Sequence, residues 1–136
     1  MAGTGEGSKG AGVYLIVLRE VLIANDITMV IHDAVPGVRV IAVMDLDDAA
    51  KQVMPDDHVS VAFLAVDPAI AMQSALVQEL AGQGTRIVIV GHDEHPALTR
   101  AMGWSVLAYP FNGDDVQHHL AVAHQPGRSA KRQRGR

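Results

Sequence analysis

The chain has 136 residues, of which 49% are hydrophobic, and its formal net charge is −4. A chain of this length buries one hydrophobic core, so we expect a single globular domain. The absence of cysteine excludes disulfides, thiolate nucleophiles and cysteine-ligated zinc. No apolar run reaches the roughly 18 residues of a membrane span or resembles the core of a signal peptide, so we expect a cytoplasmic protein.

Charge is divided unevenly along the sequence. Residues 1–126 hold six Lys or Arg and fifteen Asp or Glu, whereas residues 127–136 hold five Lys or Arg and no acid. Residues 1–12 are rich in glycine, and residues 125–136 have little apolar surface to bury, so we expect both ends to be disordered around a domain at 13–124. The basic end has no aromatic residue to stack on bases, so nucleic acid is not the expected partner. Weak electrostatic contacts of this end with nucleic acid or with an acidic partner stay open.

Five short apolar runs are predicted to form strands. In chain order they are Val13–Val17, Val38–Val43, Val59–Leu64, Ile87–Val90 and Ser105–Ala108. Each run is only a few residues long, is bounded by polar or turn residues and is rich in β-branched side chains, which favours buried strands over helices.

Segments with helical periodicity follow each of these strands. The first places Ile23, Ile27, Val30, Ile31 and Ala34 on one stripe and ends at Pro36-Gly37. The third begins at Asp67, an N-cap before Pro68, and continues as one helix through Ala69, Met72, Leu76 and Leu80 to Gly82. The other predicted helices are Asp47–Met54, Pro96–Met102 and Asp114–Ala123, the last with Val116, Leu120 and Ala123 turned inward.

This alternation of strands and helices predicts an α/β fold, with a parallel sheet covered by helices on both faces. Right-handed crossovers leave few topologies for a chain this short, and the flavodoxin-like, doubly wound strand order 2-1-3-4-5 is the expected one. A binding or reaction site on such a sheet lies at the carboxyl ends of the strands, here those of the first, third and fourth.

One segment, Val106-Leu107-Ala108-Tyr109-Pro110-Phe111, resembles the fifth strand and following Lys-Pro-Phe of the receiver domains of bacterial response regulators, the CheY-like family. The runs Val13–Val17, Phe63-Leu64 and Ile87–Val90 resemble the family's first, third and fourth strands. The resemblance extends over residues 13–123, implies the same fold, and implies a cis peptide bond before Pro110.

The family transfers a phosphoryl group to an aspartate, and the resemblance identifies the five positions of this chemistry. Leu18 and Arg19 stand where carboxylates bind magnesium, and Ala65 stands where the acceptor aspartate belongs. Gly91 replaces the hydroxyl residue that holds a phosphoryl oxygen, and Tyr109 replaces the lysine. All five depart from the pattern, so we interpret the chain as a non-catalytic pseudo-receiver that needs no cofactor.

A pseudo-receiver in two-component-type signalling would act by protein–protein contact. The resemblance implies a partner or self-association face over the fourth helix, fifth strand and fifth helix. On that face this sequence offers Leu98, Met102, Trp104 and His119. Trp104 is the single tryptophan of the chain, and a role in the core under the short fourth helix stays open for it.

Two other functions stay open. Asp67, two residues beyond Ala65, could be a displaced phosphoryl acceptor, although an N-cap role explains it sufficiently. A small-ligand sensor could use the cleft around Leu18, Ala65, Gly91 and Tyr109. The histidines are not expected to bind a metal, because His92 and His95 lie in a polar loop and the adjacent His118 and His119 face different sides of a helix.

Overall fold

The five strands form one parallel sheet with the order β2-β1-β3-β4-β5, which confirms the predicted flavodoxin-like, CheY-like arrangement. The structure, a computed structural model, describes residues 12–92 and 94–123, and the predictions for residues 1–11 and 124–136 lie outside these ranges. The strands are β1 (Val13–Val17), β2 (Arg39–Val43), β3 (Val59–Leu64), β4 (Arg86–Val90) and β5 (Ser105–Leu107).

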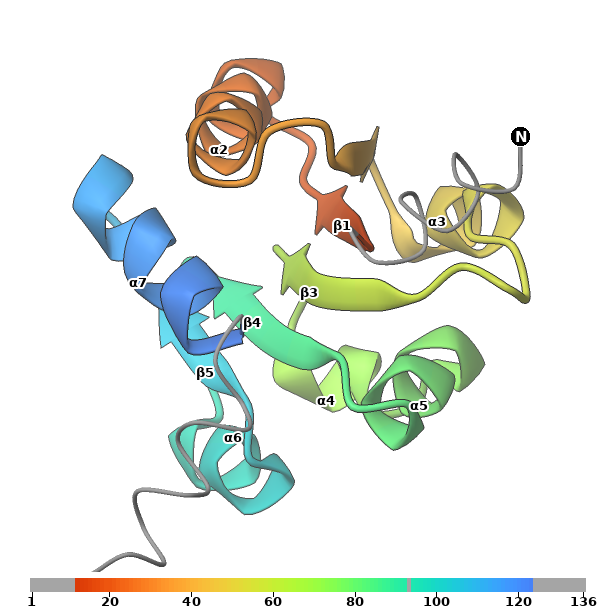
Figure 1. The fold of residues 1–136 in the computed structure, drawn as a ribbon. Coiled ribbons are helices and arrows are strands. Elements are labelled where there is room, and N and C mark those ends of the chain that lie inside the picture. Colours follow the sequence, from red (N-terminus) through yellow and green to blue (C-terminus); the bar gives the residue numbers. More distant parts are fainter. Residues whose placement is uncertain (1–11, 93, 124–136) are drawn as a thin grey trace, which may run out of the picture.

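Helices cover both faces of the sheet (Figure 1). On one face lie α2 (Val21–Ala34) and α7 (Gly113–Ala123). On the other lie α3 (Leu46–Gln52), α4 (Pro68–Ala71), α5 (Ala75–Gly82) and α6 (Pro96–Met102). Across the described part of the chain, no helix has the length and hydrophobicity to cross a membrane.

The central strands separate two hydrophobic cores. Along β1, Leu15 faces the core under α3 and α5, whereas Tyr14 and Ile16 face the core under α2 and α7. Successive side chains of a strand point to opposite faces, and every residue of β1 is buried because helices cover both. This explains why the strands appear in the sequence as continuous apolar runs without alternation.

The single helix predicted after β3 is wrong, because the segment forms two helices. The Asp67 carboxylate accepts a hydrogen bond from the backbone N–H of Ala69 and begins α4, as expected of an N-cap, but α4 has only four residues. The Ser74 hydroxyl then accepts from the N–H of Val77 at 3.3 Å and begins α5. Leu80 is buried as predicted, while Met72 and Leu76 are partly buried against the same core.

Smaller differences lie at the element ends. Ala34 was expected on the buried stripe of the first helix, but it is the last residue of α2 and is exposed. The buried residues of α2 are instead Ala24, Ile27 and Ile31. Strand β5 ends at Leu107, one residue earlier than predicted. Asn112 and Asp115 exchange side-chain to backbone hydrogen bonds of 3.0 Å, which fixes the start of α7.

Candidate functional site

Three of the five positions identified by the resemblance, Leu18, Ala65 and Gly91, directly follow strands at the carboxyl edge of the sheet. The backbone N–H of Leu18 donates to the carbonyl of Val43, and that of Ala65 donates to the carbonyl of Val17, at 2.9 and 2.8 Å. The N–H of Gly91 donates to the carbonyl of Leu107 at 3.0 Å. These bonds continue the ladders between β1 and β2, β3 and β1, and β4 and β5 by one residue at the edge where the site would lie.

The two positions matching the family's magnesium ligands point to different environments. The Leu18 side chain is 5% exposed and packs in the core under α2 and α7. Arg19 is exposed, and no ion pair joins it to Asp45 or Asp67 within residues 12–92 and 94–123. One position therefore contributes only hydrophobic packing, and the other contributes a positive charge.

Tyr109 packs directly over Gly91. Gly91 has a backbone φ of +111°, and a Cβ at this position would lie 3.4 Å from Cε2 of the Tyr109 ring. A side chain at position 91 would be strained and would press on the Tyr109 ring. Glycine at this position therefore allows the ring to pack closely against the backbone. The Tyr109 ring also stacks on Phe111, with centroids 5.5 Å apart, and the Tyr109–Pro110 bond is cis, as the resemblance implied.

The Tyr109 hydroxyl donates to the Glu20 carboxylate at 3.3 Å, which links β5 to the start of α2. Burial raises the pKa of Tyr109, and the charge of Glu20 and this hydrogen bond raise it further. The phenol thus stays neutral and bridges the edge of the sheet. The sequence did not predict this contact, because the partners are 89 residues apart and lie beyond β1 and β5, which are not neighbours in the sheet.

Asp67 is occupied by two structural interactions. Its Oδ1 accepts from the Ala69 N–H at 2.8 Å and lies 3.2 Å from Nδ1 of His95. The first bond caps α4, and the second joins the loop after β3 to the start of α6. The pairing with His95 was not predicted, since its only sequence signal was the position of both residues just beyond parallel strands.

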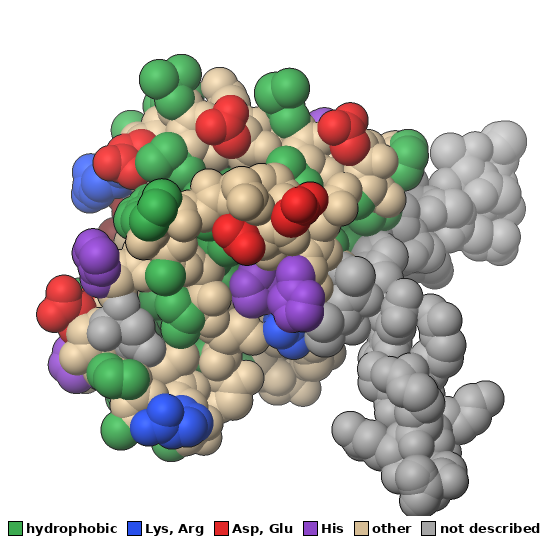
Figure 2. Space-filling view, turned by 90° about the vertical axis from the view of Figure 1, so that its left-hand side faces the viewer, with side chains coloured by type: hydrophobic (Ala, Val, Ile, Leu, Met, Phe, Trp, Pro, Cys, Tyr) green, Lys and Arg blue, Asp and Glu red, His purple; other side chains and the backbone are tan. Residues whose placement is uncertain are grey.

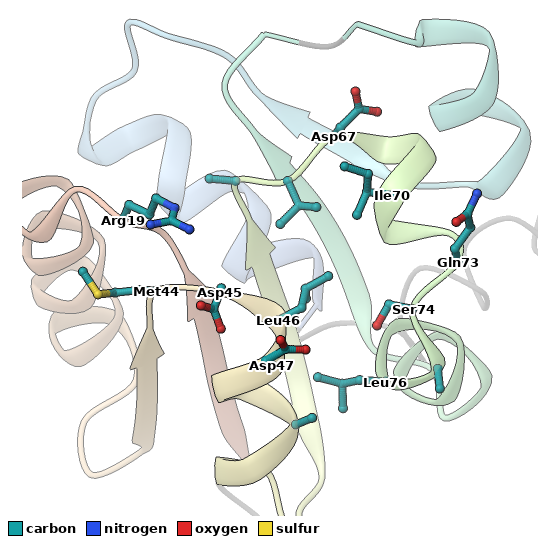
Figure 3. Close-up of a pocket in the computed structure, with 14 residues that line it drawn as sticks. Arg19, Met44, Asp45, Leu46, Asp47, Asp67, Ile70, Gln73, Ser74 and Leu76 are labelled. Carbon is teal, nitrogen blue, oxygen red and sulfur yellow. The ribbon is translucent and has the colours of Figure 1, made fainter.

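A groove of about 900 Å³ lies beside these positions, between α3 on one side and α4 and α5 on the other (Figure 3). Leu46 and Leu76 lie between the helices in this view, and Arg19 comes from the end of β1. The remaining lining includes both polar and apolar side chains, among them Met44, Asp45, Asp47, Ala65, Val66, Asp67 and Ile70. Asp45 caps α3 through the Asp48 N–H at 2.8 Å.

The predicted partner face is corrected at two of its four residues. Trp104 is 9% exposed and belongs to the core under α3 and α5, because Gly103, with φ of 75°, ends α6 and turns the chain inward. His119 is 8% exposed. Leu98 is half-buried and Met102 is 40% exposed, so the four side chains do not form one exposed surface.

His119 lies in α7 beside β5, where its Nδ1 is buried without a hydrogen-bond partner. Burial lowers the pKa of His119, and the nearby charges of Arg86 and His118 lower it further. No three His, Cys, Asp or Glu side chains of the described residues gather as a metal site would require. His92 and His95 are exposed in the segment between β4 and α6, whereas His118 and His119 lie in α7.

Comparisons with known proteins bear on the fold. No protein-family model and no curated protein matches the chain. Among solved structures, the chain is similar to the crystal structure of an adenylate cyclase from Rhodopirellula baltica, with a TM-score of 0.59. The two are 13% identical in sequence, and the match covers 82% of this chain and 86% of that one. At this identity the likeness shows a shared α/β fold.

Proposed function

We propose that this domain is a receiver-like module that works by protein–protein contact, without aspartyl phosphorylation, in bacterial two-component-type signalling in the cytoplasm. The observation that carries the proposal is the residue set at the carboxyl edge of the sheet, where Leu18 and Ala65 directly follow β1 and β3 and Tyr109 packs over Gly91. This edge is where open α/β sheets hold their ligands.

The side chains at this edge oppose the family's chemistry. Transfer of a phosphoryl group to a carboxylate needs oxygen ligands for magnesium and an acidic acceptor. Leu18 is buried in the core and has no oxygen, and Ala65 offers only a methyl group. Arg19 adds a positive charge that repels a divalent cation. A metal-assisted transfer therefore has neither its ligands nor its nucleophile at these positions.

Tyr109 supports a structural role for the same edge. Its ring covers Gly91, and its hydroxyl is bonded to Glu20. The Tyr109 ring therefore fills the space above Gly91, where a phosphoryl oxygen would bind in the family. Its hydroxyl already donates to Glu20. Asp67, the alternative acceptor, is bound to the Ala69 N–H and to His95, which argues for its role as a cap.

A small-ligand sensor is the second candidate, and the groove between α3 and α5 favours it. The groove has a volume of about 900 Å³, which is large enough for a drug-sized ligand. It lies beside Ala65 and Asp67 and not over Gly91, where Tyr109 packs. A ligand would therefore bind next to the family's phosphorylation position and contact α3, α4 and α5.

Incubation with acetyl phosphate and magnesium, followed by intact-protein mass spectrometry, tests the proposal. The wild-type protein should gain no phosphoryl group, and Ala65→Asp should gain none either, because no carboxylate pair holds the metal. Since Ala65 is exposed, this variant should fold with a stability within about 0.5 kcal/mol of wild type.

Phosphorylation of the wild-type protein that disappears in Asp67→Asn would establish the displaced acceptor and overturn the proposal. Phosphorylation of Ala65→Asp, but not of the wild-type protein, would show that magnesium still binds beside Leu18 and Arg19. This result would contradict the proposal that the metal site is lost. Affinity purification from the native host, with Met102→Asp as a surface variant, would then identify the protein that the domain contacts.

A further inference from the structure

A second, smaller groove lies between α2 and the start of α7, on the opposite face of the sheet from the groove beside Ala65. It has a volume of about 320 Å³, and Met29, Val30 and Phe111 line it together with Asp26 and Asp33. Met29 is 64% exposed, and Leu22, on the same helix, is 79% exposed. The groove thus combines apolar walls with carboxylates at its rim.

The helices of this face carry acidic side chains and no Lys or Arg, and the partly buried Arg86 lies near His119 beside α7. Helix α2 contains Asp26 and Asp33, helix α7 contains Asp114 and Asp115, and neither helix contains Lys or Arg. Figure 2 looks at the molecule from the side of α7, and acidic and hydrophobic side chains alternate over its upper part, along α2. Among the described residues, no ion pair neutralises Asp26, Asp33 or Asp114.

The position of Asp33 is unfavourable for the helix that carries it. Asp33 lies in the last turn of α2, where the partial charge of the helix dipole is negative. A cation is stabilising at such a position and an acid is not. The charge of Asp33 therefore does not stabilise α2. A basic ligand beside α2 would offset the unfavourable interaction of this charge with the helix dipole.

Long basic side chains match the chemistry of this groove. The methylene stem of Lys or Arg packs along apolar surface while its charged end reaches a carboxylate. Such a segment is present in the chain, because residues 127–136 hold Arg128, Lys131, Arg132, Arg134 and Arg136 without an acid. It begins four residues after Ala123, the last residue of α7, and the groove is lined by the first turn of the same helix.

The distance is compatible with a contact within one molecule. Helix α7 has eleven residues, which correspond to about 16 Å along its axis. Arg128 is five residues beyond Ala123 and Arg136 is thirteen, so an extended chain would reach at most about 17 and 45 Å from the helix end. A short tether gives millimolar effective concentrations, and even a weak contact would be substantially populated.

We infer that the basic segment 127–136 docks in the acidic groove between α2 and α7 of its own chain and covers this face. The contact would compete with any other basic ligand for the face. The alternative groove beside Ala65 is a poorer match, because Arg19 lines it and Asp45 and Asp67 serve as helix caps.

Paramagnetic relaxation in the full chain tests this inference. The protein has no cysteine, so Ser129→Cys provides a single attachment site for a spin label. At low salt, amide signals of residues 26–33 and 112–116 should lose roughly half of their intensity, as expected for a tethered contact of millimolar affinity. The signals should recover at 1 M NaCl, where the screening length falls to about 3 Å.

Matched variants and a mixed sample complete the experiment. Asp26→Asn with Asp33→Asn should restore the signals, whereas Asp47→Asn with Asp56→Asn, also exposed acids, should leave the broadening unchanged. In the mixed sample, one protein carries the spin label but no ¹⁵N, and the other carries ¹⁵N but no spin label. The signals of the ¹⁵N protein should not be broadened. Three results would overturn the inference. The first is no broadening in the spin-labelled chain, and the second is broadening centred on α3 and α5. The third is broadening in the mixed sample, which would show contact between copies.

Discussion

Trp104 and Met102 lie two residues apart in environments that differ sharply. The Trp104 side chain is 9% exposed and packs in the core under α3 and α5, while Met102 is 40% exposed on α6. The backbone N–H of Trp104 also donates to the carbonyl of Thr99 at 3.0 Å. Trp104 therefore contributes to folding, and of the two only Met102 is available for contact with a partner.

Replacement of Trp104 by alanine should lower the free energy of unfolding by about 3–5 kcal/mol, because it removes a large core side chain and leaves a cavity. Met102→Ala should change it by less than about 0.5 kcal/mol. Urea unfolding followed by far-ultraviolet circular dichroism measures both without relying on tryptophan fluorescence. Equal stability of Trp104→Ala and Met102→Ala would show that Trp104 is not a core residue.

His119 gives the fold a dependence on pH. Burial lowers its pKa below the ordinary value of 6.5, and Arg86 and His118 add to this effect, while Asp115 and a hydrogen bond with the backbone of Val106 oppose it. Below about pH 6.5 the unfolded chain binds a proton at this histidine more readily than the folded one. Protonation at low pH therefore favours unfolding.

The free energy of unfolding should decrease as the pH falls below about 6.5, and His119→Gln should flatten this part of the profile. His32→Gln, at an exposed position of α2, is the matched control and should keep the wild-type slope. Chemical denaturation at a series of pH values between 5 and 8 measures the slopes. An unchanged slope in His119→Gln would assign the pH dependence to other groups.

At the level of elements, the break between α4 and α5 is a feature that the sequence pattern did not predict. Apolar periodicity continues across Met72–Ser74, so the pattern predicts one helix. The hydroxyl of Ser74 instead caps a new helix. Serine competes for backbone hydrogen bonds at such positions, and periodicity alone does not register this competition.

Ser74→Ala should lower the free energy of unfolding by about 1 kcal/mol, because the N–H of Val77 loses its capping partner. Gln73→Ala, at the neighbouring exposed position, should have a smaller effect. Amide hydrogen exchange adds a local readout, in which protection at the first turn of α5 should decrease in Ser74→Ala only. A Ser74→Ala protein with wild-type stability and protection would show that packing, not the cap, begins α5.

The strands and their order were predictable for a simple physical reason. A sheet covered on both faces requires continuous apolar runs, and right-handed crossovers restrict how these runs connect. Side-chain contacts across the carboxyl edge were not predictable. Tyr109 meets Glu20, and Asp67 meets His95, through the lateral order of strands and the path of loops, neither of which leaves a local pattern in the sequence.

At the scale of the whole molecule, the two faces and the carboxyl edge have separate chemistry. The face of α2 and α7 is acidic, the opposite face holds the larger groove, and the edge between them holds Ala65, Gly91 and Tyr109. Receiver chemistry would require this edge to bind a metal and an oxyanion. We assign this edge to packing, the α2/α7 face to the basic segment of the same chain, and the opposite face to contact with other molecules.

An amide NMR titration with magnesium and beryllofluoride, a mimic of the phosphoryl group, tests this central claim most directly. We expect no saturable shifts at residues 18–20, 65–67, 91 and 109, because Leu18, Arg19 and Ala65 stand in place of the metal ligands and the acceptor. Saturable shifts at residues 65–67 that disappear in Asp67→Asn would contradict it and establish a working phosphorylation site.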